Sequence, residues 1–189
     1  MAQQEEVRAS WLVSGPKAEW DAMTSAMCPR DMGFLDTAPW TVDVSMGMKT
    51  PPAQVWAALT DNPGWVSWFK NCIECGSTGQ PGGGVGSTRS IVVSGIRVDE
   101  CFIAWEPERT WAFTVLAMNR SFASSMVECV RLAPSNEGGT AIDYRMALTP
   151  KWWARPIRFV LGRVVRASWI RSFSNLDRQI GLNAKADTP

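Results

Sequence analysis

The sequence predicts an α+β fold: a seven-stranded antiparallel curved sheet wrapped around a long C-terminal helix, with two short helices after the first strand. Seven segments alternate like strands and are separated by turn residues at regular intervals, which is typical of an antiparallel meander. The segment 151–181 then carries apolar side chains every three or four residues, which is the spacing of one helix face. A chain of 189 residues can bury a core between two such layers.

The first strand and the two short helices are predicted between residues 40 and 69. In 40–48 the apolar side chains alternate with Thr, Asp and Ser, which indicates a strand. Thr50 and the two prolines after it are typical of a helix start, so we expect a helix over 50–61 with Thr50 as its cap. The turn residues that open 62–69 precede the second short helix.

The rest of the sheet and the long helix follow. Breakers rich in Gly, Pro, Asn and Glu separate six further strands, expected at 71–78, 86–94, 96–105, 109–117, 122–133 and 140–148. In 151–181, Pro156 suits a first helical turn and Gly181 suits the residue after the last. The apolar row on this helix consists of Ile157, Leu161, Val165, Trp169, Phe173, Leu176 and Ile180.

Three parts of the chain are distinguished. Residues 1–38 form an N-terminal extension with a short helix over 16–27, residues 39–181 form the sheet-and-helix domain, and residues 182–189 form a tail. The extension could cap a cavity, pack on the sheet or mediate self-association. The oligomeric state stays open, with a homodimer as one alternative.

Composition excludes several kinds of chemistry. The chain has no His, which removes the commonest general base and metal ligand and the usual catalytic triads. Five cysteines and an acidic start without an apolar run indicate reduced thiols and a cytoplasmic location. Cys72 and Cys75 lack a second pair, and on a strand they would point to opposite faces, so no metal site is expected. No cofactor is expected either.

The glycine-rich stretch GQPGGGVGSTR (79–89) invites a phosphate-binding interpretation. It fails, because a β-branched strand follows the glycines where a helix N-terminus would be needed, and the Gly-Lys-Ser/Thr ending of a P-loop is missing. We therefore expect a flexible hairpin loop between two strands, with Arg89 just behind it.

Five strings, in order, resemble the START-related helix-grip superfamily (SRPBCC), which includes the polyketide cyclase/dehydrase and lipid transport group. The strings are TPPAQVWAALTDNPGWVSWF, GVGSTRSIVVSG, DECFIAWEPERTWAFTV, GGTAIDYRMAL and FSNLDRQI. The resemblance covers about 39–181. It implies a helix-grip fold with an apolar cavity between the sheet and the long helix, and it supplies no shared catalytic residue. It also implies that the glycine hairpin lies at the cavity mouth, where the loop would act as a lid.

Strand alternation places two carboxylates, Glu100 and Glu128, on otherwise apolar inner faces. Arg89 is the natural partner, either in a structural ion pair or in a polar anchor for a ligand. Tyr144 could hydrogen-bond a ligand, act as a general acid or merely pack. Glu100 and Tyr144 are therefore the catalytic candidates if the protein is an enzyme. The expected ligand-binding residues are Arg89, Ile91, Glu100, Phe102, Trp111, Phe113, Met126, Glu128, Tyr144, Met146, Leu161 and Val165.

The favoured function is binding, or transfer, of a small hydrophobic ligand such as a lipid, sterol, quinone or polyketide. A polyketide cyclase or dehydratase using the cavity Glu, Tyr and Arg is the alternative, disfavoured by the absence of His. A second alternative is a membrane-surface or macromolecular role, because 151–189 holds eight Lys/Arg against two Asp/Glu, a net +6, with Trp152 and Trp153 where its helix starts. No aromatic–basic RNA motif is present, so no nucleic-acid partner is expected.

Overall fold

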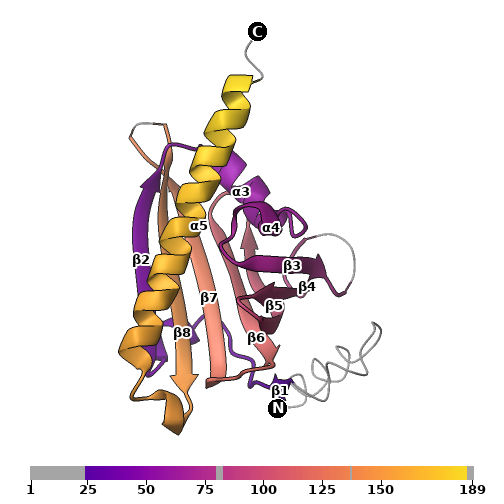
Figure 1. Ribbon diagram of the computed structural model, residues 1–189, viewed down its shortest axis with the longest axis vertical. Coiled ribbons are helices and arrows are strands. Elements are labelled where there is room, and N and C mark those ends of the chain that lie inside the picture. Colours follow the sequence, from indigo (N-terminus) through magenta and orange to yellow (C-terminus); the bar gives the residue numbers. More distant parts are fainter. Residues whose placement is uncertain (1–23, 80–82, 137, 187–189) are drawn as a thin grey trace.

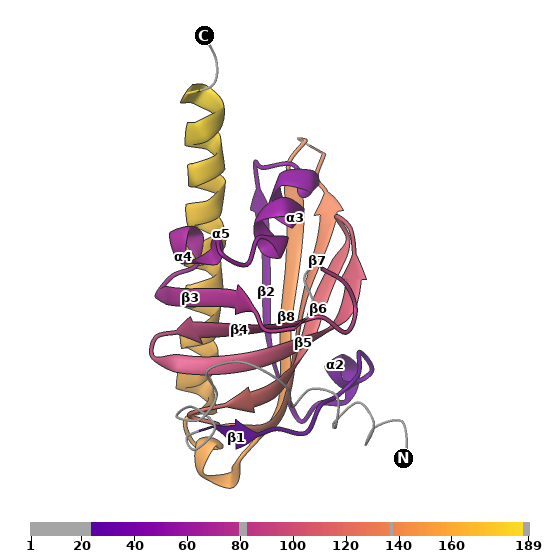
Figure 2. The same cartoon turned by 90° about the vertical axis from the view of Figure 1, so that its right-hand side faces the viewer.

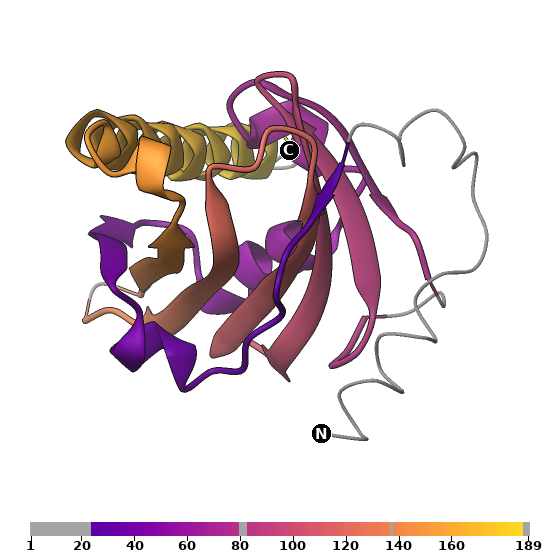
Figure 3. The same ribbon diagram turned by 90° about the horizontal axis from the view of Figure 1, so that it is seen from below.

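The computed structural model of the protein describes residues 24–79, 83–136 and 138–186. One antiparallel sheet curves around the long helix α5 (Arg158–Ala186), as Figures 1 and 3 show. The strands lie in the order β2-β8-β7-β6-β5-β4-β3, and a short strand β1 pairs with β6. The predicted α+β fold with a curved antiparallel sheet and a long C-terminal helix is confirmed.

All seven predicted strands are present, within a few residues of the predicted bounds. They are β2 (Trp40–Met48), β3 (Cys72–Ser77), β4 (Thr88–Val93), β5 (Ile96–Glu106), β6 (Thr110–Met118), β7 (Ala123–Pro134) and β8 (Thr140–Pro150). On β2, Val42 and Val44 are buried against the interior while Asp43 and Ser45 are exposed, as their alternation predicts. Figure 2 shows β3, β4 and β5 crossing the molecule roughly at right angles to β7 and β8, so the sheet is strongly twisted.

The two short helices are α3 (Pro52–Thr60) and α4 (Trp65–Trp68). Thr50 does not cap α3, which corrects that expectation: the residue before α3 is Pro51, without a side-chain cap bond. The Thr50 hydroxyl instead donates a 2.7 Å hydrogen bond to Asp177 on α5, and the Thr50 amide donates one of 2.9 Å. The link between β2 and α3 is therefore tied to the long helix.

The long helix differs from its prediction at both ends. Trp152–Ala154 form a separate 3-10 turn, η1, and α5 begins only at Arg158, two residues after Pro156. At the other end Gly181 does not terminate the helix, which continues to Ala186. A helical glycine is disfavoured by only about 1 kcal/mol, and the residues after it include good helix formers such as Leu182.

The segment before β2 packs on the sheet, which was one of the three alternatives for the extension. Ser25–Ala26 form β1 and pair with the lower end of β6, so the predicted helix over 16–27 is wrong there, and its residues 16–23 lie outside the described part. Phe34 and Leu35 of α2 (Phe34–Thr37) pack on the outer face with Ala112, Val127, Cys129 and Ala147. The sheet is thus covered on both faces at this point.

Candidate functional site

The space between the sheet and α5 holds the residues that were expected to line a cavity. Glu128, Leu161 and Val165 are half-buried. The other nine are each 4% exposed or less: Arg89, Ile91, Glu100, Phe102, Trp111, Phe113, Met126, Tyr144 and Met146. The structure therefore brings them onto one inner surface, but that surface is closely packed.

Arg89 is enclosed by aromatic rings at the centre of this surface. Its guanidinium carbon lies 4.1 Å from the ring centroid of Trp65 and 4.6 Å from that of Trp111, so cation–π attraction replaces part of its lost hydration. Its Nε donates to Glu100 Oε2 at 2.5 Å, and Nη1 donates to Asn62 Oδ1 at 3.4 Å. The arginine side chain is only 1% exposed.

Glu100 is held in this ion pair and is sealed from solvent, with its side chain 4% exposed. Burial raises the pKa of Glu100, and the Arg89 guanidinium opposes that shift by charge and by hydrogen bonding. Within this ion pair the two opposite charges compensate each other. The Arg89–Glu100 pair is therefore a closed structural unit in this conformation.

The second carboxyl, Glu128, has a different partner. On the inner face of β7 it lies opposite Phe113 on β6 and Met146 on β8. The hydroxyl of Tyr144 donates a 2.8 Å hydrogen bond to Glu128 Oε2, and the Tyr144 ring lies 4.3 Å from that of Trp169 on α5. This cluster joins the sheet to the long helix.

Burial raises the pKa of Glu128 from 4.5 to about 8, and the negative charge of Glu100 adds to the rise, while Tyr144 and Arg89 lower it in part. Burial and the neighbouring Glu128 also raise the pKa of Tyr144. At neutral pH the Glu128 carboxyl is therefore mostly protonated. It presents both a hydroxyl donor and a carbonyl acceptor inside an apolar wall.

Buried polar groups near this surface lack partners among the described residues. The indole N–H groups of Trp111 and Trp68 donate no hydrogen bond there, and the hydroxyl of Ser90 forms none. Trp111 stands two residues before Phe113 on β6, and its side chain is fully buried. An unsatisfied buried donor is unfavourable by about 1–3 kcal/mol, which an acceptor oxygen of a ligand would relieve.

Two hollows open on the described surface, and the smaller one reaches the inner-face residue Phe102. One, of about 200 Å³, opens between the α3–α4 loop and the end of the β3–β4 hairpin; its lining includes Asn62, Gly83 and Trp105. Asn62 connects this groove to the buried Arg89. The other, of about 750 Å³, lies at the β5–β6 turn and is lined by charged residues such as Glu106 and Arg131.

The glycine stretch joins two antiparallel strands, β3 and β4, which confirms the hairpin. Gly84 and Gly86 have φ values of +146° and +89°, which side chains rarely adopt. No helix follows, so the geometry of a phosphate loop is missing. The role of this loop as a lid stays a prediction.

Cys72 and Cys75 correct another expectation. Their side chains were expected on opposite faces of the strand, yet both are buried, at 7% and 8% exposure. The pairing of β3 with β4 shifts register between Cys72 and Glu74, and such a bulge turns one residue to the other face. Both are free thiols, and burial raises the pKa of Cys75 to about 12, so it is not a reactive thiolate.

Comparison with known proteins agrees with this architecture. A curved antiparallel sheet around a long C-terminal helix is the helix-grip fold, and solved structures share it. They include TTHA0849 from Thermus thermophilus (14% identity, 76% of this chain and 99% of that chain, TM-score 0.62), MLL2253 from Mesorhizobium loti (22%, 75% and 97%, 0.59) and Ara h 8.0201 (14%, 75% and 97%, 0.58).

The family model for polyketide cyclase / dehydrase and lipid transport matches residues 39–181, and the chain belongs to this family. Among curated proteins it is similar to the uncharacterized proteins Rv2574 of Mycobacterium tuberculosis and Mb2604 of Mycobacterium bovis, each 28% identical over 148 residues, which is 78% of this chain and 88% of the relative. Family and fold together support a ligand-binding role in general.

None of the helices in the described ranges combines the length and apolarity that crossing a bilayer requires.

Proposed function

We propose that the protein binds a small, apolar, uncharged molecule between the sheet and α5, with Glu128 as the anchor for its polar group. The observation that carries this proposal is the half-buried carboxyl of Glu128 on an apolar wall, hydrogen-bonded to Tyr144, where burial raises its pKa to about 8. Ligand sites in proteins commonly combine apolar walls with a few placed polar groups. Sterols, quinones and polyketides all offer a hydroxyl or carbonyl for such an anchor.

The electrostatics favour an uncharged ligand over an anionic one. Glu100 already neutralises Arg89, so no cation in this cluster is left to hold a carboxylate. Glu128 is close enough to Glu100 for that charge to raise its pKa, and a ligand anion there would meet the same repulsion. A hydroxyl or carbonyl, in contrast, can accept from the Glu128 carboxyl without adding charge.

The close packing of the wall sets a condition on binding. Leu161 and Val165 on α5 are half-buried, whereas Met126 and Met146 on the facing strands are fully packed. A ligand must therefore displace side chains on the Glu128 side of the interior. Methionine suits this because its unbranched side chain changes rotamer easily.

The test compares decanol with decanoate, two probes of equal chain length that differ in charge. Isothermal titration at pH 7 should show tighter binding of decanol, and its affinity should fall as pH rises through about 8, where Glu128 ionises. In Glu128→Gln this pH dependence should disappear, while Glu106→Gln, at an exposed position, should keep it. Tighter binding of decanoate, or an unchanged pH profile in Glu128→Gln, would contradict the proposal.

A second candidate function is acid–base catalysis of the cyclase or dehydratase type. A pKa near 8 suits a group that must both hold and release a proton near neutral pH, and this favours Glu128 as the acid. The two candidates from the sequence suit this role less well, because Glu100 is paired with Arg89 and the Tyr144 hydroxyl donates to Glu128. We expect a dehydratase to remove water from a β-hydroxy ketone, and Glu128→Gln to abolish that loss of water while decanol still binds.

A further inference from the structure

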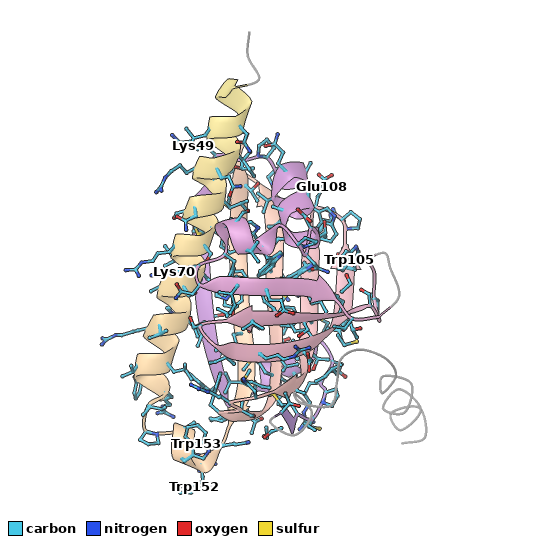
Figure 4. The ribbon with its side chains drawn as sticks, turned by 45° about the vertical axis from the view of Figure 1, so that its right-hand side comes forward. Lys49, Lys70, Trp105, Glu108, Trp152 and Trp153 are labelled. Carbon is cyan, nitrogen blue, oxygen red and sulfur yellow. The ribbon has the colours of Figure 1, made fainter. Side chains whose placement is uncertain are left out.

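An exposed apolar surface surrounds the start of α5. The side chains of Trp152 and Phe159 are 80% and 72% exposed, and those of Val160 and Val164 are 65% and 59% exposed. Val160 and Val164 are one helical turn apart, so they adjoin on the helix surface. Figure 4 shows Trp152 and Trp153 at the end of the molecule where α5 begins, far from Glu108.

Positive charge is interleaved with these apolar side chains. Between Lys151 and Leu176 the sequence holds six Lys/Arg and no Asp/Glu. The salt bridges between described residues all involve Arg89, Arg97 or Arg145 on the sheet, and none involves an arginine of α5. Within the described ranges, the surface therefore presents cations outside any ion pair around exposed Trp, Phe and Val.

The packing of α5 leaves this surface outward. The helix packs against β2 and α4, and its buried Trp169 and Phe173 contact the rings of Trp65 and Trp68 on α4. By helical spacing, Val160 and Arg171 lie on the opposite side from Trp169. The guanidinium of Arg158 lies 4.8 Å from the ring centroid of Phe159, so a cation and an aromatic ring are presented together.

We propose that this surface, formed by Lys151, Trp152, Trp153, Phe159, Val160, Arg163, Val164 and Arg171, docks the protein onto an anionic lipid bilayer. Trp, Phe and Val would enter the boundary between headgroups and acyl chains, and the arginines would contact lipid phosphates. A second copy of the chain fits less well, because a symmetric interface would bring two sets of arginines together. Nucleic acid would leave the valines and Phe159 in water.

Vesicle co-sedimentation tests the inference, with phosphatidylcholine alone and phosphatidylcholine mixed equally with phosphatidylglycerol. We expect binding to the mixed vesicles at about 0.1 M NaCl and its loss at about 0.5 M, where surface charges are screened. Replacing Arg163 and Arg171 together by Ser should weaken it about 30-fold, since each basic residue near the surface contributes about fivefold. The matched control Arg109→Ser, at the β5–β6 turn, should bind as the wild type.

A second pair of variants tests how much the apolar side chains contribute to vesicle binding. Replacing Trp152 and Phe159 together by Ser should weaken binding at least about tenfold, whereas Ile73→Ser, at a side chain 73% exposed on β3, should not. Thermal unfolding of each variant checks that it folds. Equal binding to both vesicle types, or equal loss in Ile73→Ser, would overturn the inference. A different result would also overturn it: light scattering shows a wild-type dimer that becomes a monomer in the Trp152/Phe159 variant, and the wild type binds neither kind of vesicle.

Discussion

Replacing Glu128 by Gln should change how the stability of the protein depends on pH. The folded protein holds the Glu128 proton up to about pH 8, whereas the unfolded chain releases it near pH 4.5. Because the folded state binds more protons in this window, this group's contribution is fully present below pH 4.5 and is lost as pH rises through 8. Gln keeps an acceptor for the Tyr144 hydroxyl but carries no proton to lose.

The magnitude of this pH effect follows from the pH range between the pKa of Glu128 in the unfolded chain and its pKa in the folded protein. Each pH unit corresponds to about 1.4 kcal/mol, so the 2.5 units between pH 4.5 and pH 7 correspond to about 3 kcal/mol. Partial exposure of Glu128 reduces this to about 2 kcal/mol. Relative to wild type, the free energy of unfolding of Glu128→Gln should rise by that amount between pH 4.5 and pH 7.

Urea unfolding at a series of pH values measures this difference, with Glu106→Gln as the matched control at an exposed position. The control should follow the wild-type pH dependence. If the difference between Glu128→Gln and wild type stayed constant with pH, Glu128 would have an ordinary pKa, and the reasoning about a protonated interior carboxyl would be refuted.

Two further substitutions test the buried ion pair and a close backbone contact elsewhere in the fold. Replacing Arg89 by Met leaves Glu100 buried without a counter-charge, so urea unfolding should show a loss of about 3–5 kcal/mol. Adding Glu100→Met should recover most of the lost stability. If the double variant is no more stable than Arg89→Met, the unpaired charge of Glu100 is not the cause of the loss. In Gly139→Ala the new methyl would overlap the carbonyl oxygen of Met48, so stability should fall by about 2 kcal/mol. Gly76→Ala, which meets nothing within 4 Å, should have a near wild-type melting temperature, and equal melting temperatures for both variants would argue against a close approach at Gly139.

Strand alternation explains why much of the inner surface could be predicted from the sequence. Once β5 and β8 are placed, a period of two fixes the direction of Glu100 and Tyr144, and both lie in the interior. It was harder to predict from the sequence which side chain each carboxyl contacts. Arg89 on β4 and Glu128 on β7 are separated by β5 and β6, a span of about 14 Å that an arginine–glutamate pair cannot bridge. The meander order places β8 beside β7, so Tyr144, two residues from Met146, is a diagonal neighbour of Glu128.

Other features depend on tertiary packing that periodicity does not encode. The bulge between Cys72 and Glu74 adds one residue to β3 and reverses the face expected for a thiol. Trp65 and Asn62 join Arg89 only because the α3–α4 segment folds back against the sheet. In the sequence these residues are only a turn followed by a Trp, and that pattern does not specify a contact with Arg89.

The most direct test of the account is nuclear magnetic resonance of protein labelled at its methionine methyl groups, titrated with decanol at pH 7. Met126 and Met146 lie on the inner wall, and Met146 lies opposite Glu128, whereas Met32 packs on the outer face. The account predicts that decanol shifts the methyl signals of Met126 and Met146 and leaves that of Met32 in place. Shifts confined to Met32, or no shift at saturating decanol, would contradict an interior site at Glu128.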